Sequence, residues 1–143
     1  MANSHLVILN KFYLDAILAG RKTIESRFMK NRRSVLGQVQ PGDKLFLKLS
    51  SGPVCAVASV RAVWCFEDLT PQKIARLRRR YNKLILGSDR YWRDKAGCKY
   101  GLLVRLDGVR AIKPVRINKK DWRAWVVLTE QEDFGLRKSG VLK

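Results

Sequence analysis

The stretch AGRKTIESR, at residues 19–27, marks the point where a helical pattern gives way to a strand pattern. On its N-terminal side, apolar residues recur at helical spacing from residue 11, and Asn10 and Gly20 are residue types that begin and end helices. On its C-terminal side, residues 23–28 alternate in polarity, as a strand requires. We therefore expect a short helix followed by a strand whose polar face carries Thr23, Glu25 and Arg27.

Outward from this stretch, the remaining patterns are mostly those of strands and tight turns. Further strands are expected at residues 6–9, 44–49, 54–65, 100–106, 109–117 and 126–128, with Gly108 as the hairpin turn between 100–106 and 109–117. Thr70 and Pro71 are suited to begin a helix that runs to about residue 85, and Ser88 to cap a second short one. The expected fold class is α+β and mainly β: a small antiparallel β-barrel decorated by two or three helices.

The charge of the chain is strongly positive and unevenly distributed. Its 143 residues include 30 Lys and Arg against 12 Asp and Glu, a formal net charge of +18. The excess lies in residues 21–33, 73–99 and 105–123, with net charges of +5, +8 and +5. With 46% hydrophobic residues, the chain can form one ordinary domain with a real core. Concentrated positive charge most often serves a polyanionic partner, usually nucleic acid, although a solvated face that maintains solubility is the plainer alternative.

Other features of the sequence argue against several protein classes. No apolar run is long enough for a transmembrane helix, so no membrane partner is expected. The first ten residues, MANSHLVILN, have neither a basic n-region nor a long apolar h-region, which favours the cytoplasm. His5, Cys55, Cys65 and Cys98 show no metal-ligand spacing, so we expect no metal site, cofactor or disulfide framework. His5 is expected to be structural or mobile rather than catalytic.

Three motifs, in order along the chain, resemble those of a known domain family. Residues 20–27 resemble the G-x-K-x-x-E-x-R signature of ASCH domains, which are relatives of the PUA fold. Pro-Gly-Asp at residues 41–43 precedes the next strand, as in that family, and YGLLV at residues 100–104 resembles its late tyrosine-glycine strand. The resemblance covers residues 5–128 and implies a PUA-like β-barrel with a cleft lined by the first motif. Residues 129–143 are then a C-terminal tail, which lacks periodicity and is expected to be partly mobile.

The same resemblance implies RNA binding or nucleotide handling, and some ASCH proteins are enzymes. One enzymatic branch removes the acetyl group of N4-acetylcytidine with a lysine, a threonine and a glutamate. Lys22 matches the lysine, but the threonine position is occupied by Glu25, and residues 69–88 contain no acidic residue. We therefore do not expect that activity. Other ASCH proteins are described as ribonucleases, which keeps a different enzymatic function open.

The motif residues offer chemistry for either a binding site or an active site. Glu25 can accept a hydrogen bond from the amino group of cytosine or adenine, and Arg27 can orient Glu25 or donate to a phosphate. A desolvated Lys22, with its pKa lowered by the nearby Arg27, can act as a base or nucleophile, so Lys22 and Glu25 are the catalytic candidates if the protein is an enzyme. The structural alternative is a Glu25–Arg27 ion pair that closes the mouth of the barrel. Because this strand face is polar, we expect loss of the Lys22 side chain to leave stability nearly unchanged.

Further candidate nucleic-acid contacts lie in the basic segments. One helix face carries positive charge, and Tyr91 and Trp92 lie among basic residues, an arrangement that suits base stacking but equally an apolar lid. Trp122 and Trp125 are three residues apart, and one of them is expected to be in the core. The full set of candidate contacts is Arg21, Lys22, Glu25, Arg27, Arg32, Arg33, Arg76, Arg79, Arg80, Lys83, Tyr91, Trp92 and Arg93.

Two hypotheses follow from these features. The favoured one is a module that binds RNA, or another single-stranded nucleic acid, through its backbone and inspects one nucleotide in the cleft. The alternative is an enzyme acting on RNA or a nucleotide with Lys22 at its centre. A substrate-sized pocket in which Lys22 and Glu25 face each other favours the enzyme, and an open groove continuous with the basic helix favours binding.

Overall fold

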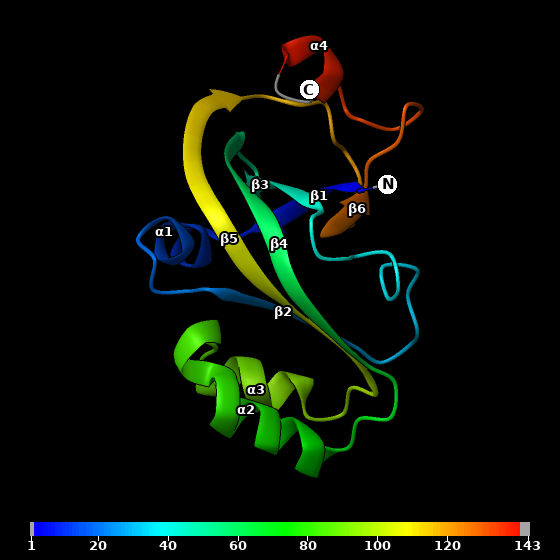
Figure 1. Ribbon diagram of the computed structural model, residues 1–143. Helices are drawn as coiled ribbons and strands as arrows, with labels where there is room; N and C mark the ends of the chain where they lie inside the picture. Colours follow the sequence, from blue (N-terminus) through cyan, green and yellow to red (C-terminus); the bar gives the residue numbers. More distant parts are fainter. Residues whose placement is uncertain (1, 141–143) are drawn as a thin grey trace.

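The strands form one curved sheet in the order β2-β5-β4-β3-β1-β6. The structure is a computed structural model that describes residues 2–140. Its elements are β1 (Ser4–Leu9), α1 (Lys11–Leu18), β2 (Ile24–Met29), β3 (Lys44–Leu49), β4 (Val54–Phe66), α2 (Pro71–Ile85), α3 (Asp89–Lys95), β5 (Tyr100–Val115), β6 (Trp125–Val127) and α4 (Leu136–Ser139). The sheet curls into a half-barrel, with α2 and α3 packed beneath β2 (Figure 1). The expected class, α+β and mainly β, is confirmed, with one more short helix in the described residues than expected.

The sheet is not wholly antiparallel, which corrects one part of the prediction. β1 runs parallel to β3, in a register that pairs Leu6 with Phe46, whereas the other neighbouring strands are antiparallel. The reason is the crossover: after β1 the chain passes through α1, adds β2 at the far edge of the sheet beside β5, and only then returns to β1 as β3. A connection of this length can bring the chain back in the same direction, which a tight hairpin cannot.

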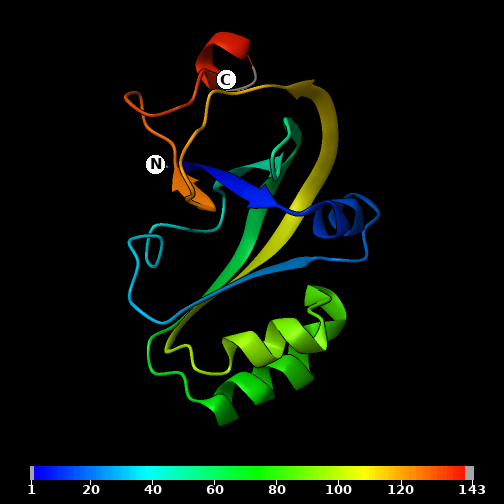
Figure 2. The same cartoon turned by 180° about the vertical axis from the view of Figure 1, so that it is seen from behind.

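Gly108 does not form a hairpin turn. β5 continues through it as one strand of 16 residues, which bends around the half-barrel beside β4 (Figure 2). Gly108 has a φ of +56°, and the register with β4 shifts between the pairs Val57–Arg110 and Ser59–Asp107. A glycine with positive φ at such a shift forms a β-bulge, which bends a strand without reversing it. Asp-Gly is a signal for both structures, which explains the wrong prediction.

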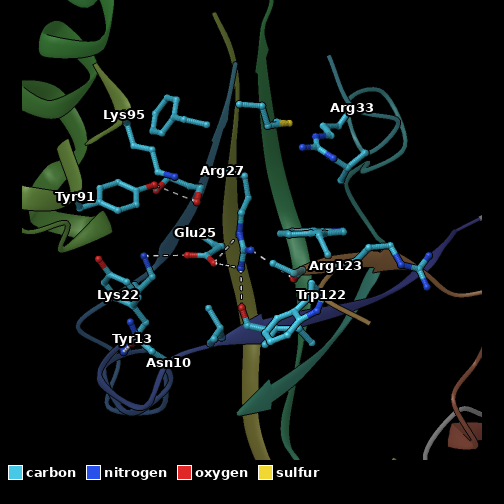
Figure 3. Close-up of a pocket in the computed structure, with 18 of the residues that line it drawn as sticks. Asn10, Tyr13, Lys22, Glu25, Arg27, Arg33, Tyr91, Lys95, Trp122 and Arg123 are labelled. Atoms are coloured by element: carbon cyan, nitrogen blue, oxygen red, sulfur yellow. Dashed lines mark hydrogen bonds and ion pairs between the residues drawn. The ribbon is translucent and has the colours of Figure 1, made fainter. Parts of the chain in front are cut away.

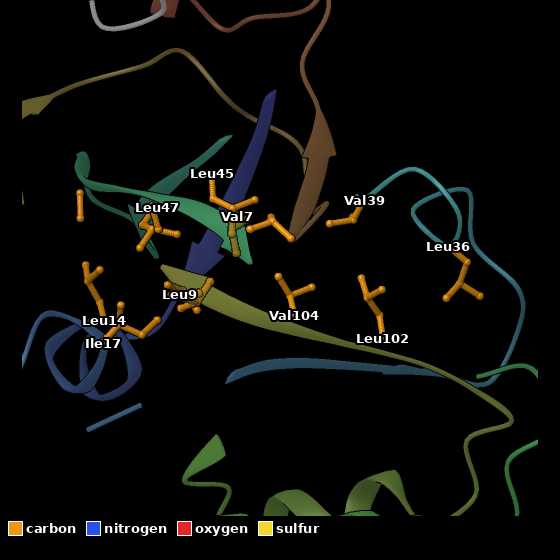
Figure 4. Close-up of a cluster of buried hydrophobic side chains, with 14 residues drawn as sticks. Val7, Leu9, Leu14, Ile17, Leu36, Val39, Leu45, Leu47, Leu102 and Val104 are labelled. Carbon is orange, nitrogen blue, oxygen red and sulfur yellow. The ribbon is translucent and has the colours of Figure 1, made fainter. Parts of the chain in front are cut away.

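Two separate apolar clusters lie on opposite sides of β2. The cluster inside the half-barrel joins α1 to β3 and β5 through residues such as Leu14, Leu47 and Val104 (Figure 4). The second cluster lies between the sheet and α2 and α3, and includes Phe28 and Trp92. The face of β2 that carries Glu25 and Arg27 is therefore polar, as expected, but Glu25 is buried and Arg27 is only partly exposed.

The local signals for the helices are confirmed. The side-chain oxygens of Asn10, Thr70 and Ser88 each accept a hydrogen bond from a backbone N–H in the first turn of α1, α2 and α3, respectively. None of the helices in residues 2–140 has the length and apolar character that a bilayer crossing requires. Residues 129–140 pack against the sheet through Leu136, which is fully buried beside Leu6 and Phe46. The last three residues of the expected tail, 141–143, lie outside the described part of the chain.

A buried histidine ties β1 to β6 and to the turn before β3. The His5 ring is fully buried, and its Nε2 lies 2.7 Å from Asp43 Oδ2. Trp125 Nε1 donates to His5 Nδ1 at 3.1 Å, so Nδ1 is the acceptor and Nε2 carries the proton. Asp43 also accepts from the backbone N–H groups of Asn3 and Gln40, which gives the Pro-Gly-Asp motif a structural role. Burial lowers the pKa of His5 below 6.5, although Asp43 opposes this effect.

We predict that His5 makes the protein less stable in mild acid. The unfolded chain takes up a proton at His5 near pH 6.5, whereas in the folded protein burial lowers the pKa of His5, and its Nδ1 already accepts from Trp125. The unfolded state therefore binds more protons, and the free energy of unfolding falls by up to about 1.4 kcal/mol per pH unit below that value. Thermal melts from roughly pH 8 to pH 5 measure this slope. His5→Gln, which does not titrate, should flatten it, and an equal slope in the variant would contradict the assignment.

Candidate functional site

A cavity of about 580 Å³ opens against β2, between the start of α1, α3 and residues 122–125. Its floor is charged and is formed by Lys22, Glu25 and Arg27. Figure 3 shows Glu25 and Arg27 at the centre, Tyr91 and Lys95 on one side, and Arg33, Arg123 and Trp122 on the other. The rings of Tyr13, Tyr91 and Trp125 contribute to its walls. The cavity therefore has a charged floor, aromatic walls and a basic rim.

Lys22 is buried at the floor, and its ammonium group has three acceptors. Its Nζ donates to the carbonyl oxygens of Ile24 at 2.9 Å and Ile85 at 2.6 Å, and lies 3.2 Å from Glu25 Oε1. An ammonium has three hydrogens, so these three acceptors saturate it. Ile85 is the last residue of α2, where a carbonyl without a helical partner and the helix dipole both favour a cation. Lys22 is only 2% exposed, which corrects the expectation that it lies on the surface.

Arg27 connects β2 to the opposite side of the half-barrel. Its guanidinium bonds Glu25 Oε2 through Nη2 at 2.6 Å and Nε at 3.2 Å. The same group donates to the carbonyl oxygens of Ile8 at 3.0 Å and Ala124 at 3.4 Å. β2 and β6 are the two edges of the sheet, so Arg27 bridges a gap that no strand pairing closes. The ion pair expected to close the barrel mouth is present.

The electrostatics of the floor keep Glu25 ionised. Burial by itself would raise the pKa of Glu25, but Arg27 and Lys22 outweigh it and hold that pKa below its usual value. Burial lowers the pKa of Lys22, with Glu25 opposing and Arg27 contributing least. The expected direction for Lys22 is therefore right, but the main cause is burial rather than Arg27. Each carboxylate oxygen has two lone pairs, so Glu25 Oε1, beside Lys22 alone, retains capacity for a ligand donor.

Tyr91 forms a neutral aromatic wall. Its hydroxyl lies 2.6 Å from Ser26 Oγ and donates to the Ser26 carbonyl at 3.3 Å. Burial raises the pKa of Tyr91 far above its usual value, so the hydroxyl stays protonated. Lys95 Nζ lies 5.5 Å from the centre of the Tyr91 ring, close to the cavity entrance. The ring can pack on a planar ligand while the ammonium meets an anionic group.

The structure brings only some of the sequence-predicted residues together. Lys22, Glu25, Arg27, Arg33 and Tyr91 all line the cavity. Trp92 does not present its ring to a base, because it is 3% exposed and its Nε1 donates to Asn82 Oδ1 at 2.9 Å; the stacking prediction for it is wrong. The predicted basic residues that lie outside the cavity are Arg21, Arg32, Arg76, Arg79, Arg80, Lys83 and Arg93.

These outlying residues occupy different surfaces. Arg32 pairs with Glu67 at 2.8 Å. Arg93 lines a separate groove between α2 and α3. The basic face of α2 is exposed, as expected, but no residue of α2 lines the cavity, so the two are not one continuous groove.

Sequence reasoning missed several cavity residues, namely Asn10, Tyr13, Lys95, Trp122 and Arg123. From the sequence, Asn10 is expected only to cap a helix; in the structure it caps α1 and also lines the cavity. Of the tryptophan pair, Trp125 is the partly buried one, packed against the core, and Trp122 is 100% exposed at the cavity rim. No local sequence pattern reveals this side of the cavity, because its position depends on the pairing of β6 with β1. Within residues 2–140, no group of three or more His, Cys, Asp or Glu side chains is placed to hold a metal ion.

Comparisons with known proteins identify the fold. No protein-family model matches the sequence, and no curated protein matches it. The solved ASCH structure from Zymomonas mobilis is similar over 97% of this chain and 94% of that one, with 17% identity and a TM-score of 0.71. A serine-to-alanine variant of that protein gives 19% identity and a TM-score of 0.72, over 97% and 95% of the two chains. The chain therefore has the fold of an ASCH domain, which is PUA-like, as its motifs imply.

We predict that Lys22→Ala destabilises the protein strongly. The change leaves two buried carbonyl oxygens without a donor and the Glu25 carboxylate with Arg27 alone, and breaking a buried ion pair costs about 3–5 kcal/mol. Lys11→Ala is the matched control, because Lys11 also pairs with a carboxylate, at 2.7 Å from Asp15, but is 76% exposed. Its cost should be below about 0.5 kcal/mol. Urea unfolding of both variants measures the difference, and equal stabilities would show that the buried contacts contribute nothing.

Proposed function

We propose that the chain binds RNA, or another single-stranded nucleic acid, and receives one nucleotide in the cavity over Glu25. The observation that carries this proposal is an ionised, buried carboxylate at the floor of a basic-rimmed cavity of about 580 Å³. That volume is typical of small-molecule sites. The ASCH fold and the matching motif at residues 20–27 support it, because the family that they resemble is generally RNA-binding or nucleotide-handling.

The chemistry of the floor favours a base with an exocyclic amino group. Glu25 Oε1 has spare acceptor capacity, and cytosine and adenine offer an amino donor at their Watson–Crick edge. The rings of Tyr13, Tyr91 and Trp125 can contact the faces and edges of the base. Arg33 and Lys95 at the rim are then the groups that meet the phosphates.

We propose that the nucleic-acid backbone crosses α3 on leaving the cavity, because no groove in the described part of the chain joins the cavity directly to α2. Lys95 lies at the cavity and Arg93 on the same helix lines the groove toward α2, where Arg78 lies on the other side. Beyond this groove, α2 presents an exposed basic face composed of Arg76, Arg79, Arg80 and Lys83. We propose that these residues contact phosphates without base specificity.

We predict that the α2 face sets the salt dependence of binding. The triple change Arg76→Ala, Arg79→Ala and Lys83→Ala removes three phosphate contacts, so the slope of log K against log salt should flatten by about 2 units for a single strand. The matched control is the triple change Arg105→Ala, Arg110→Ala and Lys113→Ala, which removes the same charge from exposed positions on β5. Fluorescence anisotropy with a labelled RNA at several salt concentrations compares the two. If both triples flatten the slope equally, net charge alone is responsible and the α2 contacts are wrong.

The enzymatic alternative rests on two observations: Lys22 and Glu25 face each other at 3.2 Å in a cavity of substrate size, and the basic face of α2 is not continuous with that cavity. Against it, the three hydrogens of the Lys22 ammonium already have acceptors. A nucleophile needs a free lone pair, which this saturated ammonium lacks. Binding is therefore the better supported function.

We predict no efficient deacetylation of N4-acetylcytidine. Amide hydrolysis requires an attacking group, a base and a donor for the developing oxyanion. The ionised Glu25 carboxylate occupies the position of the family's threonine hydroxyl and would repel an oxyanion. Incubation of the protein with the nucleoside, followed by chromatography, should show no product. Turnover of about 1 per second or faster, abolished by Glu25→Gln, would establish the enzyme instead.

A further inference from the structure

Trp122 is exposed to an extent that the fold does not require. Its side chain is 100% exposed, whereas Trp92 is buried and Trp64 and Trp125 are partly buried against apolar clusters. Leaving a whole indole in water forgoes the apolar burial that a tryptophan normally provides. The ring lies at the rim of the cavity, near Arg123 and on the opposite side from Tyr91 (Figure 3). The ring therefore contributes no burial to the core.

The backbone on both sides of Trp122 is braced. The Asp121 carboxylate accepts from Lys119 Nζ at 2.8 Å, from Arg123 Nη2 at 2.8 Å and from the Arg123 backbone N–H at 2.9 Å. The Arg123 guanidinium also makes two bonds to Glu132, at 2.9 and 2.7 Å. Because Asp121 and Arg123 flank Trp122, this network fixes the segment that presents the ring. A preorganised segment loses less conformational entropy when a ligand binds.

The same segment is tied to the floor of the cavity. The Ala124 carbonyl accepts from the Arg27 guanidinium at 3.4 Å and from the Ile8 backbone N–H at 2.9 Å. Arg27 in turn holds Glu25. The position of Trp122 is therefore set relative to the carboxylate that would read the base.

We propose that Trp122 is a stacking platform for a second base, the neighbour of the nucleotide in the cavity. This inference rests on the proposed function and narrows it, because the ligand then has at least two nucleotides. The surroundings favour a nucleobase over an apolar protein surface. The residues on either side of the indole are exposed and charged, and Arg33 and Lys95 add positive charge at the rim. An exposed aromatic ring beside basic residues is the arrangement that binds single strands by stacking.

The test compares one nucleotide with two. The probes are cytidine 5′-monophosphate, adenosine 5′-monophosphate and the corresponding cytidine and adenosine dinucleotides, titrated by calorimetry. We expect the protein to bind a dinucleotide about tenfold or more tightly than the mononucleotide. Trp122→Ala should bring this ratio close to one, and Trp122→Phe, which keeps a smaller ring, should retain part of it. Leu18→Ala is the control: it truncates an exposed apolar side chain that is not among the cavity residues, and should keep the ratio.

The possible outcomes separate the stacking role of Trp122 from the proposed nucleotide binding on which it rests. If no nucleotide binds to the unaltered protein, the proposed function fails and the inference with it. If both probes bind and Trp122→Ala changes the affinity for neither, nucleotide binding stands and the stacking role is overturned, which would assign the exposed indole to a different kind of partner. If Trp122→Ala weakens both probes equally, the ring contacts the base in the cavity and not a neighbouring one. Thermal melts should show unchanged folding, because the ring contacts no core residue.

Discussion

The fold depends on a buried chain of charges that runs from Lys22 through Glu25 to Arg27. Lys22 binds the last carbonyl of α2, and Arg27 binds carbonyls at the end of β1 and just before β6. One carboxylate thus holds two cations, which connect three regions that strand pairing leaves apart. Buried charges are costly unless all of them are partnered, so the three residues are stable as a set and none can be removed alone.

This dependence limits how the site can be separated from the fold. The residues that give the cavity its charged floor also hold β2 to α2 and to the opposite edge of the sheet. A loss of binding after replacement of Lys22 or Glu25 therefore reports on structure as much as on recognition. The rim residues Arg33, Lys95 and Trp122 are exposed or only partly buried, and they allow the ligand contacts to be examined with the fold intact.

Local features were predictable from the sequence, whereas features set by distant contacts were not. Caps at Asn10, Thr70 and Ser88 depend on neighbouring residues and were identified correctly. The burial of Lys22 depends on a carbonyl 63 residues away, which no local pattern reveals. Gly108 was misassigned because Asp-Gly suits a turn and a bulge alike, and only the pairing partner decides between them. The motif predicted which residues form the floor, but the rim required knowledge of how β6 meets β1.

The position of β6 has a consequence for the order in which the elements of the protein form during synthesis. β1, near the start of the chain, lies between β3 and β6, and β6 comes from residues 125–127. Contacts between segments so distant in sequence form slowly and only after the later segment exists. On the ribosome, the basic helix α2 is therefore complete well before Trp125 and Ala124 emerge to form their side of the cavity. Under the proposed function, a nascent chain would attract polyanions through its charge before it could select among them, and selectivity would begin only with the last strand.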